Sequence, residues 1–279
     1  MIAAIAALLT GSLPVNLAEG QAMYGSAPSV ERFNGCGIEN RTFFNGEEIV
    51  YKIYYQVSFI WMSAGEVVFR VNETPKHYHI TVDGRTYGSY DVFYRVRDRY
   101  ETWIDKKTLL PVEFKQELQQ GKYRRYEHYL FDQNTKSVVA YKGKTPDAEL
   151  RRKEVTLDDC MHDLISILYY VRNMNFDQVE AGQRFPIEVF LGKQYDLSVR
   201  ILEKNVEQRV RGQGKYMTHL FSPELIESEL FREKDAMRIW VSADENKIPL
   251  LIESPLSVGK MKAVLKSHSG LRHELDCRL

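Results

Sequence analysis

The chain has 279 residues, of which 44% are hydrophobic and 12% aromatic, and its 38 basic residues equal its 38 acidic residues. A chain of this length can bury about 75% of the surface that it exposes when unfolded, so its fold does not depend on disulfide bonds. The zero net charge excludes a global field that would attract nucleic acid, and we expect no nucleic-acid partner.

Residues 1–22 have the pattern of a secretory signal peptide. Met1–Leu9 is a short apolar run, and Gly20-Gln21-Ala22 supplies the small residues that signal peptidase prefers, although no basic residue precedes the run. No later stretch approaches the ~20 apolar residues of a membrane helix. We therefore expect an exported protein, periplasmic or associated with the outer membrane, that is not an integral membrane protein.

The clearest strand pattern lies in residues 44–69. Its first half places five apolar residues on one face by strict alternation: Ile49, Tyr51, Ile53, Tyr55 and Val57. Alternation of β-branched and aromatic residues is typical of a strand with one buried face. Ser63-Ala64-Gly65 predicts a break, after which Val67 and Phe69 restart the alternation on a return strand.

Further alternating segments follow, separated by short turn sequences. Asp83-Gly84, Gln120-Gly121 and Asp244-Glu245-Asn246 are the predicted turns. We expect a mostly β fold: one large antiparallel sheet, curved or barrel-like, with one main helix at about residues 156–174. Residues 23–42 are the predicted N-terminal arm, and residues 43–279 a single β-rich domain.

The predicted helix carries an apolar stripe at steps of three and four residues: Met161, Leu164, Ile165, Leu168 and Val171. Thr156 or Asp158 is the expected N-cap. So apolar a helix must pack on another surface, and we expect it to dock on the hollow or the face of the sheet.

The segment at residues 122–132 is unusual because both of its faces combine aromatic and charged residues. Tyr123 and Arg125 fall on one face, and Tyr126 and His128 fall on the other. A solvated sheet face with cross-strand ion pairs explains this pattern. The alternative is a wet, aromatic-lined concavity for a polar ligand such as a sugar, in which these four residues would contact the ligand.

Three separated stretches resemble the bacterial family called domain of unknown function 3108. They are Phe44-x-Gly46-Glu47-x-x-x-Tyr51 with Ala64-Gly65, the helical stretch from Asp163 to Arg172, and Ile239-Trp240-Val241-Ser242-x-Asp244-x-x-x-Ile248-Pro249. The resemblance implies an exported protein of Gram-negative envelopes, built of antiparallel strands in a barrel-like or strongly curved sheet. It supplies no established activity and therefore no catalytic residues.

Asp163 and Arg172 belong to the resembling stretch and bracket the apolar stripe. We expect them to anchor the helix to the sheet by buried hydrogen bonds or an ion pair, with ligand binding as the alternative. If the chain were a metalloenzyme or a hydrolase, His162 together with Asp159 or Asp163 would supply the metal ligands or the catalytic groups. No further ligand set accompanies them in the sequence, so we predict no metal and no cofactor.

Three cysteines, Cys36, Cys160 and Cys277, leave the disulfide pairing open. A Cys36–Cys277 bond would tie the two ends of the mature chain together.

No phosphate loop, nucleophile elbow or zinc-protease helix is present. We therefore predict a non-catalytic envelope protein that binds a glycan, lipid or protein partner on a curved β surface. The first alternative is a carrier of an apolar ligand in a half-barrel cavity. The second is a hydrolase or metalloenzyme that uses His162 with Asp159 or Asp163.

Overall fold

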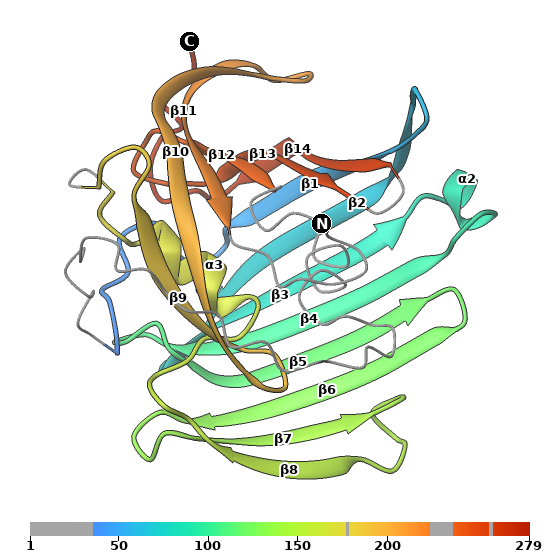
Figure 1. The fold of residues 1–279 in the computed structure, drawn as a ribbon, viewed down its shortest axis with the longest axis vertical. Helices are drawn as coiled ribbons and strands as arrows, with labels where there is room; N and C mark the ends of the chain where they lie inside the picture. The colour runs from blue at the N-terminus through green and yellow to red at the C-terminus, as the bar shows by residue number, and fades with distance from the viewer. Residues whose placement is uncertain (1–35, 177–178, 224–236, 257–258) are drawn as a thin grey trace.

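The computed structural model describes residues 36–176, 179–223, 237–256 and 259–279. These residues form fourteen strands and two short helices (Figure 1). The strands are β1 (Glu48–Val57), β2 (Ile60–Glu73), β3 (His77–Thr86), β4 (Val96–Asp105), β5 (Pro111–Gln120), β6 (Tyr123–Asp132), β7 (Ser137–Gly143), β8 (Arg151–Thr156), β9 (Arg184–Phe190), β10 (Gln194–Val210), β11 (Gly214–Pro223), β12 (Arg238–Ser242), β13 (Pro249–Pro255) and β14 (Lys260–Ser269). The helices are α2 (Gly88–Asp91) and α3 (Ser166–Arg172).

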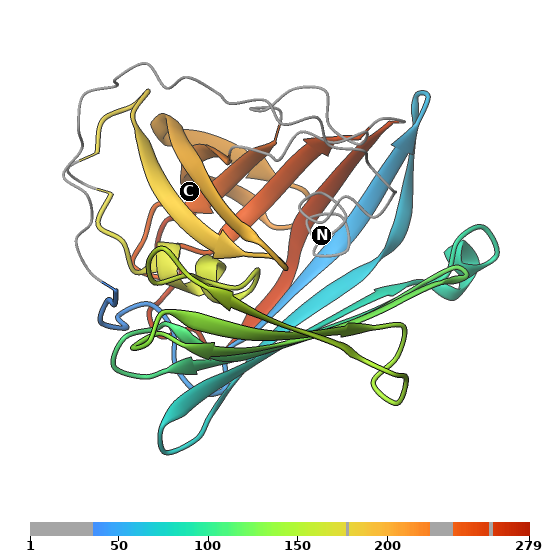
Figure 2. The same cartoon turned by 60° about the horizontal axis from the view of Figure 1, so that its bottom comes forward.

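All fourteen strands belong to a single antiparallel sheet. Its order is β8-β7-β6-β5-β4-β3-β2-β1-β14-β13-β12-β11-β10-β9. Every chain connection joins neighbouring strands except the one from β8 to β9, and the first strand, β1, pairs with the last, β14. The sheet curves around α3 without closing, and β8 and β9 are its two edges (Figures 1 and 2). The predicted fold class is confirmed.

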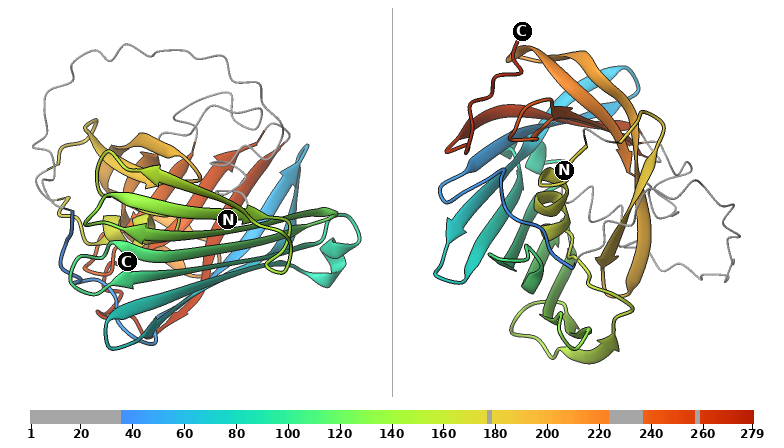
Figure 3. Two further views of the ribbon diagram at one scale, coloured as in Figure 1. Left: turned by 90° about the horizontal axis from the view of Figure 1, so that it is seen from below. Right: turned by 90° about the vertical axis from the view of Figure 1, so that its left-hand side faces the viewer.

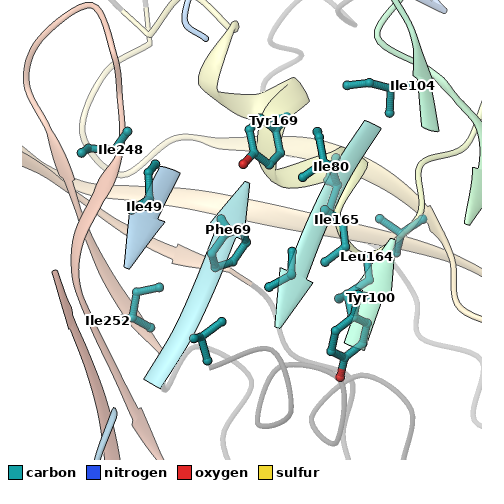
Figure 4. Close-up of a cluster of buried hydrophobic side chains, with 14 of the residues drawn as sticks. Ile49, Phe69, Ile80, Tyr100, Ile104, Leu164, Ile165, Tyr169, Ile248 and Ile252 are labelled. Atoms are coloured by element: carbon teal, nitrogen blue, oxygen red, sulfur yellow. The ribbon is translucent and has the colours of Figure 1, made fainter. Parts of the chain in front are cut away.

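The alternation seen in the sequence decides which side chains face the concave side. Ile49 and Tyr51 of β1 are buried there, opposite Phe69 and Val67 of β2 in the register. Figure 4 shows how α3 lies over this face, with Tyr169 directed toward the strands that carry Ile49 and Ile80. The concave face and the helix therefore share the hydrophobic core.

Two turn predictions are wrong. The β1–β2 turn lies at Ser58-Phe59, and Ser63–Gly65 continue β2, where a register shift at Ile53/Tyr54 absorbs the irregularity. Asp83-Gly84 lies inside β3, with Asp83 opposite Val68 and Arg99. Pairing with strands on both sides outweighs a local turn preference, because it satisfies the backbone groups of both residues.

The main helix is shorter than the predicted 156–174. Thr156 ends β8, and residues 157–165 are irregular, so neither Thr156 nor Asp158 is the cap. The carboxylate of Asp163 instead accepts hydrogen bonds from the backbone N–H groups of Ile165 (2.7 Å) and Ser166 (2.9 Å) at the start of α3. Leu164 and Ile165 are buried as the stripe predicted, but they precede the helix.

The irregular segment 157–165 spans the gap between the two halves of the sheet. His162 pairs with the β9 edge through backbone hydrogen bonds to Glu188 (3.0 Å) and Phe190 (2.8 Å). The side-chain amide of Gln133, which follows β6, donates a hydrogen bond to the backbone oxygen of Met161 (2.9 Å) and accepts one from its N–H group (3.3 Å). Figure 3 shows α3 enclosed between the two halves of the curved sheet.

Cys36 is bonded to Cys160, not to Cys277. The bond fastens the residues before β1 to the irregular segment before α3. Cys277 is buried and has a free thiol, whose pKa burial raises to about 12 with a further contribution from Asp244. The residues predicted as a signal peptide lie outside the described part of the chain.

Candidate functional site

A cavity of about 170 Å³ lies on the concave side of the sheet, beside α3. Side chains from three groups of elements line it, and all but two of them, Arg172 and Lys247, are uncharged. The lining consists of Ile49, Tyr51 and Phe69 from β1 and β2; Leu164, Ile167, Leu168, Tyr169, Val171, Arg172 and Phe176 from the α3 region; and Phe185, Ile187, Val189, Leu191, Leu197, Val199, Phe221, Pro223, Met237, Ile239, Val241, Lys247, Pro249 and Ile252. The cavity is therefore an apolar space between the helix and both halves of the sheet.

Several of the apolar residues that line the cavity are not fully buried. Leu168 and Val171 on α3 and Ile187, Leu197 and Val199 on β9 and β10 remain partly accessible. A filled core would bury such side chains completely, because protein interiors pack about as densely as organic crystals. The curved sheet thus keeps an accessible apolar surface on its inner side.

Arg172 lines the cavity and forms a buried ion pair. Its guanidinium forms two hydrogen bonds to the carboxylate of Glu47, at 2.7 and 2.8 Å. It also donates to the backbone oxygens of Asn246 (3.0 Å) and Thr42 (3.2 Å), and it stacks on the ring of Tyr169. One side chain thereby joins α3 to the residues before β1 and to the β12–β13 turn.

Asp163 is also buried and bonded within the protein. Besides capping α3, it accepts a hydrogen bond of 2.6 Å from the hydroxyl of Thr102 on β4. Burial raises the pKa of Asp163 to about 6, and the hydrogen bonds from Thr102 and the helix N-terminus oppose this shift. Asp163 and Arg172 thus occupy the anchoring positions that we expected, and a contact of either with a ligand stays a prediction.

The His162 side chain is buried, with 5% of its surface exposed. Its Nδ1 atom is 3.2 Å from the Ser166 hydroxyl, and its ring lies 4.3 Å from the Tyr170 ring at a tilt of 46°. Burial lowers the pKa of His162 to about 3. Among the described residues, the one cluster with metal-ligand geometry comprises Cys36, Asp159 and Cys160. Because the two cysteines are bonded to each other, neither offers a thiolate.

The four residues predicted on β6 lie on opposite faces of the sheet. Arg125 faces inward and pairs with Glu127 at 2.5 Å, and Lys142 of β7 adds a second cation at 2.9 Å from that carboxylate. Burial favours the neutral form of Glu127, but the two cations outweigh it and hold its pKa below the usual value.

On the outer face, His128 hydrogen-bonds to Glu113 of β5 at 2.9 Å. Tyr123 lies on the inner face and Tyr126 on the outer one, so the four residues do not form one surface. The cross-strand ion pairs that we expected are present, and ligand binding by this set stays a prediction.

The sequence offered a half-barrel cavity only as an alternative and did not identify its lining, because the lining comes from strands and a helix separated by up to about two hundred residues. The one available signal was that β9, β10 and β12 carry apolar residues on a face that needs a partner, as Ile187, Val199 and Val241 do. Among the described helices, neither has the length and apolar character needed to cross a membrane.

Comparison with known proteins supports the fold. A solved structure from Brucella abortus, described as a beta-barrel-like protein of domain of unknown function DUF1849, matches with a TM-score of 0.54. The two sequences are 9% identical, and the match covers 82% of this chain and 98% of the other. No curated protein sequence matches. The family model described as "Protein of unknown function (DUF3108)" matches residues 50–266, and the chain therefore belongs to this family.

Proposed function

We propose that this chain is an exported, non-catalytic binding protein that holds the apolar part of a ligand between α3 and the curved sheet. The observation that carries the proposal is the cavity of about 170 Å³ with its almost wholly apolar lining. An apolar cavity of roughly 150 Å³ is large enough to hold benzene. The space therefore suits a small apolar group or part of an acyl chain.

The open form of the sheet supports entry of such a ligand. Leu168 of α3 and Val199 of β10 line the cavity and are partly accessible, so a ligand would bury apolar surface that now faces solvent. Each buried methylene group contributes about 0.8 kcal/mol to such binding. Arg172 lines the cavity, but Glu47 already pairs with its charge, so recognition would rest mainly on shape and apolar contact.

Export is part of the proposal. The apolar run at Met1–Leu9 followed by small residues supports it, and so does the Cys36–Cys160 bond, because disulfide bonds persist mainly in oxidising compartments. A periplasmic or outer-membrane-associated protein would meet lipids and their breakdown products. These are the apolar molecules that we expect in the cavity.

A titration with cis-parinaric acid, a fluorescent fatty acid, tests the proposal. We expect saturable binding to the wild type and at least a tenfold weaker affinity for Val199→Trp, because the indole would occupy the cavity. Val139→Trp is the matched control, since Val139 lies on the outer face of β7 opposite Leu130. Absence of saturable binding, or equal affinities of the two tryptophan variants, would refute the proposal.

A further inference from the structure

Two loops at one end of the sheet expose large apolar side chains. Phe59 in the β1–β2 turn is 84% exposed, and Val92 and Phe93 after α2 are 84% and 78% exposed. Ile60 and Tyr94 beside them are about half exposed. Figure 1 shows both loops at the same end of strands β1–β4, whereas α3 lies toward the other end. We call these five residues the apolar tips.

The loop that carries Val92 and Phe93 has a firmly bonded base. Asp91 is bound by the guanidinium of Arg97 at 2.6 Å and by the hydroxyl of Thr86, and the N–H of Val96 donates to the same hydroxyl at 2.9 Å. Tyr94 lies against the backbone of Gly121, where a Cβ atom would be 3.1 Å from its ring. The apolar residues are therefore presented outward by a structured loop.

Basic residues flank the loop that carries Val92 and Phe93. Arg95 and Lys122 are adjacent, since the N–H of Gly121 donates to the backbone oxygen of Arg95 at 2.8 Å, and Arg124 follows in β6. All three are exposed, and none of them forms an ion pair with another residue in the described parts of the chain. Asp91, the acidic residue in this loop, is neutralised by Arg97. This loop thus combines exposed apolar residues with exposed basic residues, of which Arg95 also acts on the carboxylate of Asp91.

We propose that the apolar tips dock this protein on the surface of an anionic lipid bilayer. Apolar and aromatic side chains that enter the interface, flanked by cations that attract anionic headgroups, are the features of peripheral membrane binding. A protein partner fits less well, because a specific protein interface buries about 800 Å² of continuous surface per partner and the tips are two separate projections.

Sedimentation with lipid vesicles tests this proposal. We expect the wild type to bind vesicles in which phosphatidylglycerol replaces a quarter of the phosphatidylcholine, and to bind pure phosphatidylcholine more weakly. Withdrawing an aromatic side chain from an apolar phase changes an equilibrium by roughly a factor of ten. The double variant Phe59→Ser/Phe93→Ser should therefore bind at least tenfold more weakly, and Lys122→Glu should lose most of the preference for the anionic lipid.

Leu130→Ser is the matched control, because Leu130 is an exposed apolar residue on the outer face of β6, away from the tips. The proposal is overturned if the wild type stays unbound with both vesicles, or if the double variant binds as well as Leu130→Ser. It is also overturned if the wild type is a dimer that the double variant converts to a monomer, since the tips would then contact a second copy. Val199→Trp should still bind vesicles, so a failure of docking and a failure of cavity binding are distinguishable.

Discussion

Removing the charge of Glu47 should destabilise the protein more than any comparable change on its surface. Glu47 and Arg172 are 1% and 6% exposed, and the pair is bidentate. Breaking a buried ion pair by removing one partner costs roughly 3–5 kcal/mol. Glu47→Gln keeps one acceptor, and Arg172 keeps its bonds to two backbone oxygens, so we expect the lower end, a loss of about 3 kcal/mol in the free energy of unfolding.

Urea denaturation followed by circular dichroism measures this loss. Glu207→Gln is the matched control, because Glu207 pairs with Lys215 at 2.6 Å but both side chains are about half exposed. Exposed pairs contribute roughly 0–1 kcal/mol. A loss for Glu47→Gln that is no larger than that of Glu207→Gln would refute the assignment of a buried, stabilising pair.

The double variant Glu47→Leu/Arg172→Met separates anchoring from ligand binding. Apolar residues often replace a buried ion pair with little loss of stability, because both charges leave together. We expect this variant to fold and to bind cis-parinaric acid with an affinity close to that of the wild type. A folded double variant with at least tenfold weaker binding would instead favour the prediction that Arg172 contacts the ligand.

Three further predictions concern His162, the disulfide bond and Gly65. His162 has a pKa lowered to about 3, so the unfolded state binds a proton that the folded state does not as the pH falls below about 6.5. Lowering the pH from about 7 to about 5 should therefore reduce the free energy of unfolding of the wild type by about 2 kcal/mol more than that of a His162→Gln variant. The two proteins are compared at each pH, so that the opposing contribution of Asp163 cancels. An equal pH dependence in both proteins would contradict the burial of a neutral imidazole. Cys36 and Cys160 are 124 residues apart, so replacing both by serine should lower the free energy of unfolding by roughly 3–5 kcal/mol. The variant should also unfold in urea at the same concentration with and without a reductant. An undiminished response to reductant in that variant would contradict the Cys36–Cys160 bond. A Cβ atom on Gly65 would lie 2.2 Å from the backbone oxygen of Arg85, so Gly65→Ala should lower the stability measured by thermal denaturation by roughly 1–3 kcal/mol. Gly88→Ala is the control and should change the stability little, because the space at its Cβ position is open. Similar effects of the two substitutions would refute the close approach at Gly65.

The strand pattern in the sequence was sufficient to predict the antiparallel sheet, because alternation such as that of Ile49 and Tyr51 reports directly on burial. It could not place turns where pairing partners decide the outcome, as at Asp83-Gly84, which two neighbouring strands hold extended. Nor could it bound the helix, because Met161 and Leu164 are buried in an irregular segment whose conformation the β9 edge determines. Local propensity says little about such long-range contacts.

The candidate site was less accessible to sequence reasoning. Asp163 and Arg172 were expected to anchor the helix, and both have buried partners far away in the sequence, Thr102 and Glu47. Tyr123 and His128 were grouped because they are close in the chain, although alternation already placed them on opposite faces. The cavity and the apolar tips arise from the assembled sheet, so no short motif could reveal them.

Organic extraction of the protein purified from the cells that produce it, followed by mass spectrometry, tests the central claim most directly. We expect a lipid or another molecule with an apolar chain to be recovered from the wild type, and a clearly smaller amount from Val199→Trp. Recovery of no apolar molecule from the wild type, or of equal amounts from both proteins, would contradict the account.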